Sequence, residues 1–582
     1  MTTRTLFCLL FDTILLFAVI TPLASVYAGE SPNVILVITD DQGYGDLGCL
    51  GNEIIQTPHL DRLHAESVRL TDFHVSPCCT PTRAGLMTGQ NPVTVGAWGT
   101  TWGRSLPDAD ATMMADVFQN AGYKTGCFGK WHLGDNYPFR PQDRGFQEVL
   151  IHGGGGVGQA PDFWGNNYFD DTYFQNGEPE QQEGYCTDVW FDAAWDYIES
   201  CGDDPFFVYL TTNAPHGPYF VADEYSDLYA DNPDCPHAAF YGMITNIDEN
   251  MGRLVDRLES SDLADDTILI FMTDNGTAAG FRGDKGFNAG MRGTKGSIYD
   301  GGHRVPFFIR WPSGGLTGGR DVGDLATHTD IIPTLAGLCR MEIPEDAKMD
   351  GISLAPLLTG ETDSLPDRKL FVQYRQSFDP PLHGAATVMT ERWRLVSGKE
   401  LYDIDADPGQ QRNVSEEHPE IVEELSQAYD EWWAEIAPDL PAHNCIVLGD
   451  EAENPANLSS FDWHAMTAWN QSHVRGGAKI NGFWAVDIAN SGTYEITLRR
   501  WPEVVDAPIN AAIPGGTAIK ADQARLTIAG LDLTKPIPED AASITFTVNL
   551  EQGETQLQTW LTDSASEESR GAYYTSVRLA DE

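Results

Sequence analysis

The chain has 582 residues, of which 41% are hydrophobic and 10% aromatic. It is therefore long enough for two or three domains and too apolar to be a disordered protein. Its 86 acidic side chains outnumber the 36 basic ones and give a formal net charge of -50. Such a field repels nucleic acids and anionic membranes, so we expect neither as a partner. An anionic substrate would need a local cluster of basic residues that acts against the global charge.

The N-terminus has the features of a secretion signal, which we predict over residues 1–28. Arg4 supplies a positive start, residues 14–20 an apolar run, and the sequence before Ala28 a small-residue cleavage site. An uncleaved anchor is the alternative, because Asp12 interrupts the hydrophobic region. No later stretch approaches the roughly 18 to 20 apolar residues of a membrane span. We therefore expect an exported protein, periplasmic or secreted, without stable membrane insertion after signal cleavage.

Ten cysteines are present, and Cys8 would leave with the signal. The remaining nine form an odd set, which in an exported protein indicates one thiol with a special role. The sequence does not decide how the others pair. Because no two cysteines have a CxxC spacing, a zinc site is not expected.

Three apolar, β-branched runs are typical of buried parallel strands, at residues 33–38, 205–210 and 267–272. Helical patterns lie between them, the first opening at Thr57-Pro58. Two more are expected over residues 112–122 and 240–258. Strands that alternate with helices predict an α/β fold with a mainly parallel sheet flanked by helices.

Polar residues follow each of these three strands. Asp40 and Asp41 follow the first, His216 the second, and Asp274 and Asn275 the third. Since ligands bind beyond the carboxyl ends of strands in open α/β sheets, these residues predict an active site at one edge of the sheet.

The pattern changes towards the C-terminus. Residues 370–402 carry short strands, and residues 416–436 are expected to form a helix. Beyond residue 441, short alternating strands between turns indicate a small antiparallel β-sandwich. The expected domains are a catalytic α/β domain, a C-terminal α+β subdomain and an accessory sandwich, at residues 29–365, 366–440 and 441–582.

Cys79 lies where Pro81 and the helix-forming residues after it predict the start of a short helix. A group at such a position meets unpaired backbone N–H donors and the positive end of the helix dipole. Arg83, one turn later, can reach back to it. From the residues alone, Cys79 is either an activated thiol or a buried structural one.

The sequence Cys79-x-Pro81-x-Arg83, with Leu86 to Gly89 after it, closely resembles the modification signature of the type I sulfatases, a family of the alkaline phosphatase superfamily. Further motifs follow in the order expected for that family, at residues 40–43, 122–134, 213–216, 273–276, 295–306 and 401–408. The similarity covers about residues 32–440. It implies an alkaline-phosphatase-like fold and an arylsulfatase-like sulfuric ester hydrolase.

Asp40, Asp41, Asp274 and Asn275 form an oxygen-only set of ligands, which suits a hard cation and is poor for zinc. The resemblance implies Ca²⁺, with an oxygen of the modified Cys79 in its shell, and Mg²⁺ as the fallback. Without the family, such pairs could simply cap helices or make turns.

Five residues in the matching motifs supply local positive charge, which stabilises charge on sulfate oxygens. They are Arg83, Lys130, His132, His216 and Lys295. The resemblance implies that a formylglycine-generating enzyme or maturase oxidises Cys79 to Cα-formylglycine, whose hydrate attacks sulfur. His216 and Lys295 would then assist the leaving oxygen, and His132 would take the proton that expels sulfate.

The natural ester is not named by the sequence, and sulfated carbohydrate fragments are the preferred class. Phosphate or phosphonate ester hydrolysis is the alternative within the same superfamily. A carbohydrate-binding protein is another, because Trp484, Trp501 and Trp560 could stack on sugars, although such residues more often fill a sandwich core. The glycine run at residues 153–156 is either a substrate-facing loop or a plain flexible one.

Overall fold

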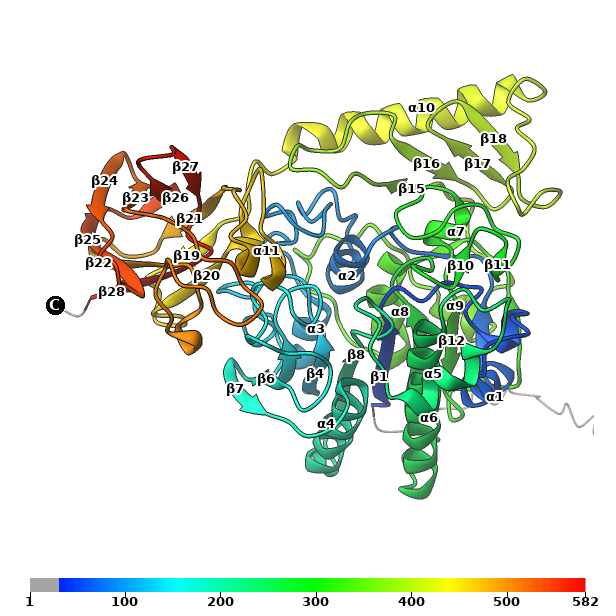
Figure 1. The fold of residues 1–582 in the computed structure, drawn as a ribbon. Helices are drawn as coiled ribbons and strands as arrows, with labels where there is room; N and C mark the ends of the chain where they lie inside the picture. Colours follow the sequence, from blue (N-terminus) through cyan, green and yellow to red (C-terminus); the bar gives the residue numbers. More distant parts are fainter. Residues whose placement is uncertain (1–30, 581–582) are drawn as a thin grey trace, which may run out of the picture.

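A computed structural model describes residues 31–580, so the signal predicted over residues 1–28 lies outside the described residues. Figure 1 shows that the molecule has three parts. A large sheet flanked by helices forms the centre, a small sheet lies beneath the long helix α10 (Pro419–Ile436), and two further sheets form the C-terminal end.

The central sheet has ten strands in the order β13-β2-β12-β9-β1-β8-β4-β5-β6-β7. Its middle strands β9, β1, β8, β4 and β5 are all parallel, whereas β12, β6 and β7 pair antiparallel. The strands are β1 (Asn33–Thr39), β2 (Val68–Leu70), β4 (Lys124–Lys130), β5 (Glu148–His152), β6 (Thr172–Gln175), β7 (Glu178–Gln181), β8 (Phe206–Thr211), β9 (Thr267–Thr273), β12 (Phe307–Arg310) and β13 (Asp321–Val322).

Helices bury both faces of this sheet. Along β1, Val34 and Leu36 belong to one hydrophobic core and Ile35 and Val37 to another, as expected where successive side chains point to opposite faces. The first core includes α2 (Cys79–Thr88), α3 (Met114–Asn120), α8 (Ile331–Cys339) and α9 (Ala355–Leu358), and the second α1 (Pro58–Glu66), α4 (Cys186–Cys201) and α6 (Ala238–Ser260). The predicted α/β class with a mainly parallel sheet is confirmed.

Shorter elements complete this part. A helix, α5 (Asp223–Ala230), packs on α6, and a short helix, α7 (Asp300–His303), precedes β12. Two small sheets pair β10 (Phe281–Arg282) with β11 (Lys285–Gly286), and β14 (Ala326–Thr327) with β3 (Phe73–His74).

The second part is an antiparallel sheet of four strands, β15 (Leu370–Gln373), β16 (Ala386–Met389), β17 (Trp393–Val396) and β18 (Glu400–Asp403). Helix α10 covers it, and Leu395, Leu425 and Tyr429 lie in the shared core. The short strands within residues 370–403 and the helix agree with the sequence prediction of strands over residues 370–402 and a helix over residues 416–436.

The third part is a sandwich of two sheets, β19-β21-β26-β23-β24 with β27 on β26, and β20-β28-β22-β25. All of its strand pairs are antiparallel except β19 with β21, which are parallel. The strands are β19 (Ile446–Leu448), β20 (Ala456–Ser459), β21 (Phe483–Ile488), β22 (Gly492–Arg499), β23 (Gln523–Ile528), β24 (Leu531–Pro536), β25 (Ser543–Leu550), β26 (Gly553–Asp563), β27 (Glu568–Arg570) and β28 (Tyr574–Leu579), with one short helix, α11 (Gln471–Gly476).

The sandwich core contains Trp484 and Trp501, which are at most 1% exposed. Trp560 is half-buried beneath the guanidinium of Arg525. Trp484 and Trp501 therefore fill the core and offer no surface for a sugar.

The nine cysteines within residues 31–580 are all free thiols. Over the same residues, no helix combines the length and the apolar character needed to cross a membrane.

Candidate active site

The polar residues at the strand ends converge, as the sequence predicts. Asp40 and Asp41 follow β1, and Asp274 and Asn275 follow its neighbour β9. The backbone N–H of Asp41 donates to Oδ1 of Asp274 at 3.0 Å, and Nδ2 of Asn275 donates to Oδ1 of Asp41 at 3.1 Å. On the other side of β1, β4 ends at Lys130 next to β8. The parallel strands thus bring groups distant in sequence to one edge of the sheet.

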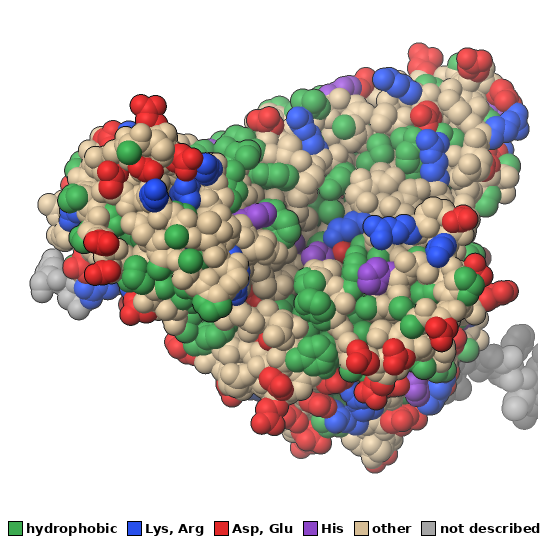
Figure 2. Space-filling model, viewed as in Figure 1, with side chains coloured by type: hydrophobic (Ala, Val, Ile, Leu, Met, Phe, Trp, Pro, Cys, Tyr) green, Lys and Arg blue, Asp and Glu red, His purple; other side chains and the backbone are tan. Residues whose placement is uncertain are grey.

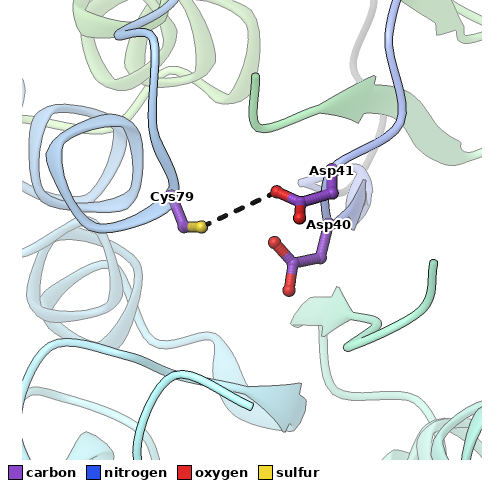
Figure 3. Close-up of side chains that lie close together, drawn as sticks. All are labelled: Asp40, Asp41 and Cys79. Carbon is purple, nitrogen blue, oxygen red and sulfur yellow. Dashed lines mark hydrogen bonds between the residues drawn. The ribbon is translucent and has the colours of Figure 1, made fainter. Parts of the chain in front are cut away.

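Cys79 faces this carboxylate cluster from the first position of α2 (Figure 3). Its Sγ lies 4.0 Å from Oδ1 of Asp41, and the side chain is buried. Burial raises the pKa of the Cys79 thiol well above its usual value, although Lys130 and Lys295 act in the opposite direction. Cys79 therefore stays protonated and is not an activated thiolate.

Each of the three aspartates has its own cationic partner. Nζ of Lys130 lies 2.6 Å from Asp40, and Nζ of Lys295 lies 2.5 Å from Asp41. Arg83 binds Asp274 through Nη2 at 2.9 Å and Nε at 3.2 Å. Five of these six side chains are almost fully buried, and Lys295 is 24% exposed.

The guanidinium of Arg83 also ties the site to the ends of two strands. Its Nη1 donates to the backbone oxygen of Lys130 at 2.9 Å and to the hydroxyl of Thr211. Arg83, one turn along α2 from Cys79, is thereby fixed with its guanidinium against Asp274.

The cluster keeps oxygens that suit a cation. Oδ1 of Asp40 and Oδ1 of Asn275 are buried without a hydrogen-bond partner, which is costly unless a further group binds them. Burial, and then the neighbouring Asp40, raise the pKa of Asp274 to about 7, which indicates uncompensated negative charge. Ligand atoms of Asp40, Asp41 and Cys79 lie within 4.8 Å of one another. These residues fit a hard cation with oxygen ligands.

Asp41 is the most strongly compensated of the aspartates. Burial would raise its pKa, but Lys295, His216 and Lys130 outweigh burial and hold the pKa well below its usual range. Burial likewise disfavours the charge of Lys295, yet Asp41 keeps the pKa of that lysine above its usual value. Both groups are therefore charged at neutral pH.

His132 is held as a neutral ring with one free nitrogen. Its Nε2 lies 3.1 Å from the carbonyl oxygen of Thr100, and since a carbonyl can only accept, Nε2 carries the hydrogen. Nδ1 is then the unprotonated nitrogen, and it is buried without a partner. Burial, followed by the charge of Lys130, lowers the pKa of His132 well below its usual value. This nitrogen can accept a proton.

His216 lies at the other side of Asp41. Its Nδ1 donates to the carbonyl oxygen of Gly217 at 2.6 Å, and its Nε2 is 3.8 Å from Oδ2 of Asp41. Burial lowers the pKa of His216 to about 4 in spite of that carboxylate. The ring is therefore neutral at neutral pH.

The glycine run at residues 153–156 packs directly against both histidines. A Cβ on Gly155 would meet the His132 ring at 2.2 Å, and one on Gly156 would lie 3.3 Å from Nδ1 of His216. Since a larger residue at position 155 would displace His132, this loop forms part of the site and is not a plain flexible connection. Trp164, beyond the run, packs edge-on against Trp501 of the sandwich.

All ten predicted site residues lie in this one cluster. Sequence reasoning missed Thr100, Thr211 and Phe461, which contact residues of the cluster, and Tyr374, whose hydroxyl lies 3.4 Å from Sγ of the adjacent Cys78. Thr211 at the end of β8 could have been found as another polar residue at a strand end. Thr100 acts through its backbone carbonyl, which leaves no sequence signal. The cluster lies where several parts of the chain meet, and Figure 2 shows a hollow in the middle of this face with Lys, Arg and His side chains around it.

Comparison with known families agrees with this geometry. The family described as "Sulfatase" matches residues 32–341, and the one described as "N-sulphoglucosamine sulphohydrolase, C-terminal" matches residues 294–434. The first match alone spans more than half of the chain and includes every residue of the cluster.

Similar proteins are known by sequence and by structure. Human arylsulfatase A is 30% identical over 443 residues, which cover 69% of this chain and 83% of that protein. The N-acetylgalactosamine-6-O-sulfatase of Bacteroides thetaiotaomicron is 29% identical over 68% of this chain and 92% of its own. The crystal structure of Ps i-CgsB in complex with k-i-k-neocarrahexaose has a TM-score of 0.63 and 26% identity, and covers 71% of this chain and 94% of that one. The chain belongs to the sulfatase family and is a hydrolase of sulfate esters.

Proposed function

We propose that this protein is an exported, formylglycine- and Ca²⁺-dependent sulfatase that acts on sulfated carbohydrates. The observation that carries the proposal is Cys79, a protonated and buried thiol that faces an oxygen-only ligand set. A thiol held in this state is a poor nucleophile, so a modified side chain accounts better for its position. Formylglycine at this position would supply, as its hydrate, the hydroxyl needed to attack sulfur.

The proposed ligands of Ca²⁺ are Asp40, Asp41, Asp274, Asn275 and the modified Cys79, with Mg²⁺ as the fallback. Bound there, the cation would compensate the carboxylates and polarise a sulfate oxygen. The orphaned oxygens of Asp40 and Asn275 support this assignment.

The basic residues are assigned by the charges they carry. Arg83 is fixed beneath Asp274, and Lys130 neutralises Asp40, so both hold the site in place and counter its negative charge. Lys295, charged and 24% exposed, is proposed to stabilise negative charge on the leaving oxygen. His216 would assist the same oxygen after taking up a proton at Nε2, which lies 3.8 Å from Asp41, because in the neutral ring the hydrogen is on Nδ1.

His132 is proposed as the base that takes the proton of the second hydroxyl, so that sulfate is expelled. Its free Nδ1 and the carbonyl of Thr100 on Nε2 set the tautomer that this step requires.

Names of relatives support the carbohydrate class, since they include an N-acetylgalactosamine-6-O-sulfatase and a structure in complex with neocarrahexaose. We further propose removal of residues 1–28 on export and conversion of Cys79 by a formylglycine-generating enzyme or maturase. The proposed domains remain residues 29–365, 366–440 and 441–582.

Mass spectrometry of the peptide that contains Cys79, on active enzyme, tests the modification. We expect the mass of formylglycine in place of cysteine, loss of activity in Cys79→Ala, and retention of both modification and activity in Cys78→Ala. Active enzyme that contains only unmodified Cys79 would refute the mechanism.

A side-by-side assay with 4-nitrophenyl sulfate and 4-nitrophenyl phosphate tests the reaction class. We expect the sulfate to be hydrolysed faster. Faster hydrolysis of the phosphate would favour a phosphate or phosphonate ester hydrolase instead.

A further inference from the structure

One segment of the C-terminal sandwich, residues 459–471, reaches into the active-site region. The ring of Phe461 lies 5.9 Å from that of His132. The ring of His464 occupies the space in which a Cβ of Gly103 would lie, at 2.3 Å. Because Gly103 is three residues from Thr100, whose carbonyl binds His132, the sandwich supports one of the two loops around this histidine.

The end of the same segment holds the other loop. Nε2 of Gln471 lies within hydrogen-bond distance of three backbone oxygens, those of Gln159, Asp162 and Phe163, at 3.1, 3.2 and 3.2 Å. The backbone N–H of Ala160 donates to the carbonyl oxygen of Trp469 at 3.0 Å. This loop contains the glycines that touch His132 and His216.

Between these two anchors, the segment leaves two large hydrophobic side chains in solvent. Met466 is 54% exposed and Trp469 is 39% exposed. Three other tryptophans of the sandwich, Trp463, Trp484 and Trp501, are at most 1% exposed. All other tryptophans within residues 31–580 are buried or half-buried. The ring of Trp469 leans edge-on against His473 at 5.2 Å. The backbone of Trp469 is fixed by a hydrogen bond and its ring by the contact with His473, while part of the indole is open to water. Such a side chain is preorganised to bind a ligand.

Backbone hydrogen bonds connect Trp469 to the loop that contacts His216. Gly156 touches His216, and a turn closed by the hydrogen bond from Gln159 N–H to the Gly156 oxygen leads directly to Ala160, the partner of Trp469. Such a turn brings its ends within about 7 Å. The backbone of Trp469 is therefore bound to the loop that touches His216, one residue beyond the turn that begins at Gly156.

We propose that Trp469 is a specificity-determining residue that stacks on the sugar ring next to the sulfated one. This inference rests on the proposed function, because it takes the substrate to be a sulfated oligosaccharide. The apolar C–H face of a pyranose packs on an indole, whose amphipathic ring suits such a ligand. An uncharged contact also avoids the repulsion that a chain with a net charge of -50 exerts on a polyanion. The accessory sandwich thus forms part of the substrate-binding site.

The test compares Trp469→Ala with Trp560→Ala, a matched change of a half-buried tryptophan elsewhere in the sandwich. The probes are 4-nitrophenyl sulfate, N-acetylgalactosamine 6-sulfate, a disaccharide that contains it, and neocarrahexaose. For the best oligosaccharide, we expect Trp469→Ala to lower kcat/KM about tenfold, mainly through KM. Hydrolysis of the aryl sulfate should be unchanged, Trp469→Tyr should restore much of the loss, and Trp560→Ala should match the wild type throughout.

Equal losses on the aryl sulfate and the oligosaccharide would assign Trp469 a structural role and overturn the proposal. Unchanged kcat/KM on the oligosaccharide would overturn it as well. Wild-type enzyme that hydrolyses the aryl sulfate but none of the sugars would refute the sugar subsite while leaving the sulfatase reaction intact. Failure on the aryl sulfate and on every sugar would instead refute the proposed function.

Discussion

Two buried acidic clusters lie in the part of the molecule built on the large sheet, and they differ in what balances their charge. Ligand atoms of Asp40, Asp41 and Cys79 lie within 4.8 Å of one another, and so do those of a second group, Asp72, His74 and Asp300. By composition and burial alone, either group could hold a metal ion.

In the second cluster, one fully buried guanidinium lies close to both carboxylates. Arg394 of β17 places Nη2 at 2.8 Å from Asp72 and Nε at 3.3 Å from Asp300. In the first cluster, Lys130 and Lys295 approach from the sides, and the oxygens Oδ1 of Asp40 and Oδ1 of Asn275 stay without partners.

Burial and the neighbouring Asp40 raise the pKa of Asp274 in the first cluster to about 7. In the second cluster, burial would raise the pKa values of Asp72 and Asp300, but Arg394 holds them below their usual range. Oxygens without a hydrogen-bond partner occur in both clusters, on Asp40 and on Asp300. The difference teaches that the balance of charge, and not the number of acidic groups or of unpaired oxygens, distinguishes a site open to a cation from a closed structural network.

The largest effect is expected from Asp40→Asn, which keeps the shape of the side chain but removes its charge. We expect a loss of kcat of about 10³ to 10⁴-fold, since a cation contributes several kcal/mol to stabilising the transition state. A chelator should lower both the activity and the melting temperature of the wild type, and added Ca²⁺ should restore them.

The matched change in the second cluster is Asp72→Asn. Its melting temperature should respond to chelator and Ca²⁺ as that of the wild type does, whereas Asp40→Asn should respond much less. A Ca²⁺ response that disappears in Asp72→Asn and persists in Asp40→Asn would reverse the assignment of the two clusters.

The next effect concerns Arg394→Met, which leaves Asp72 and Asp300 buried without their cation. We expect the free energy of unfolding to fall by about 3 to 5 kcal/mol, the usual cost of breaking a buried ion pair from one side. Urea denaturation measures it. The control is Arg392→Met, which breaks an exposed pair with Asp403 and should leave the urea midpoint unchanged. Similar midpoints for both variants would show that the second cluster is not held by its arginine.

The smallest effect is a pH dependence of stability that comes from His303, whose Nδ1 lies 2.9 Å from Nδ1 of His74 in the second cluster. Burial, and then the neighbouring His74, lower its folded-state pKa to about 3. The unfolded chain, with a histidine pKa of about 6.5, therefore binds a proton that the folded protein does not. Stability should fall as the pH drops from about 6.5 towards 3, by up to about 1.4 kcal/mol per pH unit for this group.

Urea unfolding of the wild type and of His303→Gln at pH 8.5, 7.5, 5.5 and 4.5 measures this slope. The variant should show the shallower dependence, and the slopes should coincide above pH 7.5. An equally steep slope in both proteins would mean that other buried groups account for the acid sensitivity.

Much of the fold could be predicted because its signals are local. The three runs predicted as strands match β1, β8 and β9 to within one or two residues, since long β-branched stretches occur where both faces of a sheet are buried. Strand β4 was missed because its sequence, Lys124–Lys130, contains two glycines and little β-branched character. Gly129 is needed there, as a Cβ would lie 1.8 Å from the backbone oxygen of Thr211.

Residues whose side chains carry the chemistry of the site could be predicted from the sequence. Residues that contribute only backbone groups could not. The residues of the motifs lie together, whereas the carbonyl of Thr100 that orients His132 has no sequence signal. The role of the sandwich was hidden for a different reason. Contacts such as Phe461 with His132 join residues more than 300 positions apart, and the pattern of short strands drew attention to Trp484 and Trp501, which are buried.

The side-chain amide of Gln471 has a consequence for how this protein can change over evolutionary time. Its partners in the loop are all backbone groups, three oxygens near Nε2 and the N–H of Gly165 that donates to Oε1, and these are present whatever side chains the loop carries. Pro161 and Phe163 can therefore be replaced without loss of these contacts, provided that the backbone keeps its path, whereas Gln159 and Asp162 also bind backbone N–H groups of the loop through their side chains. A single glutamine in one domain thus allows the loop of another to diversify in sequence while the histidines behind it keep their positions.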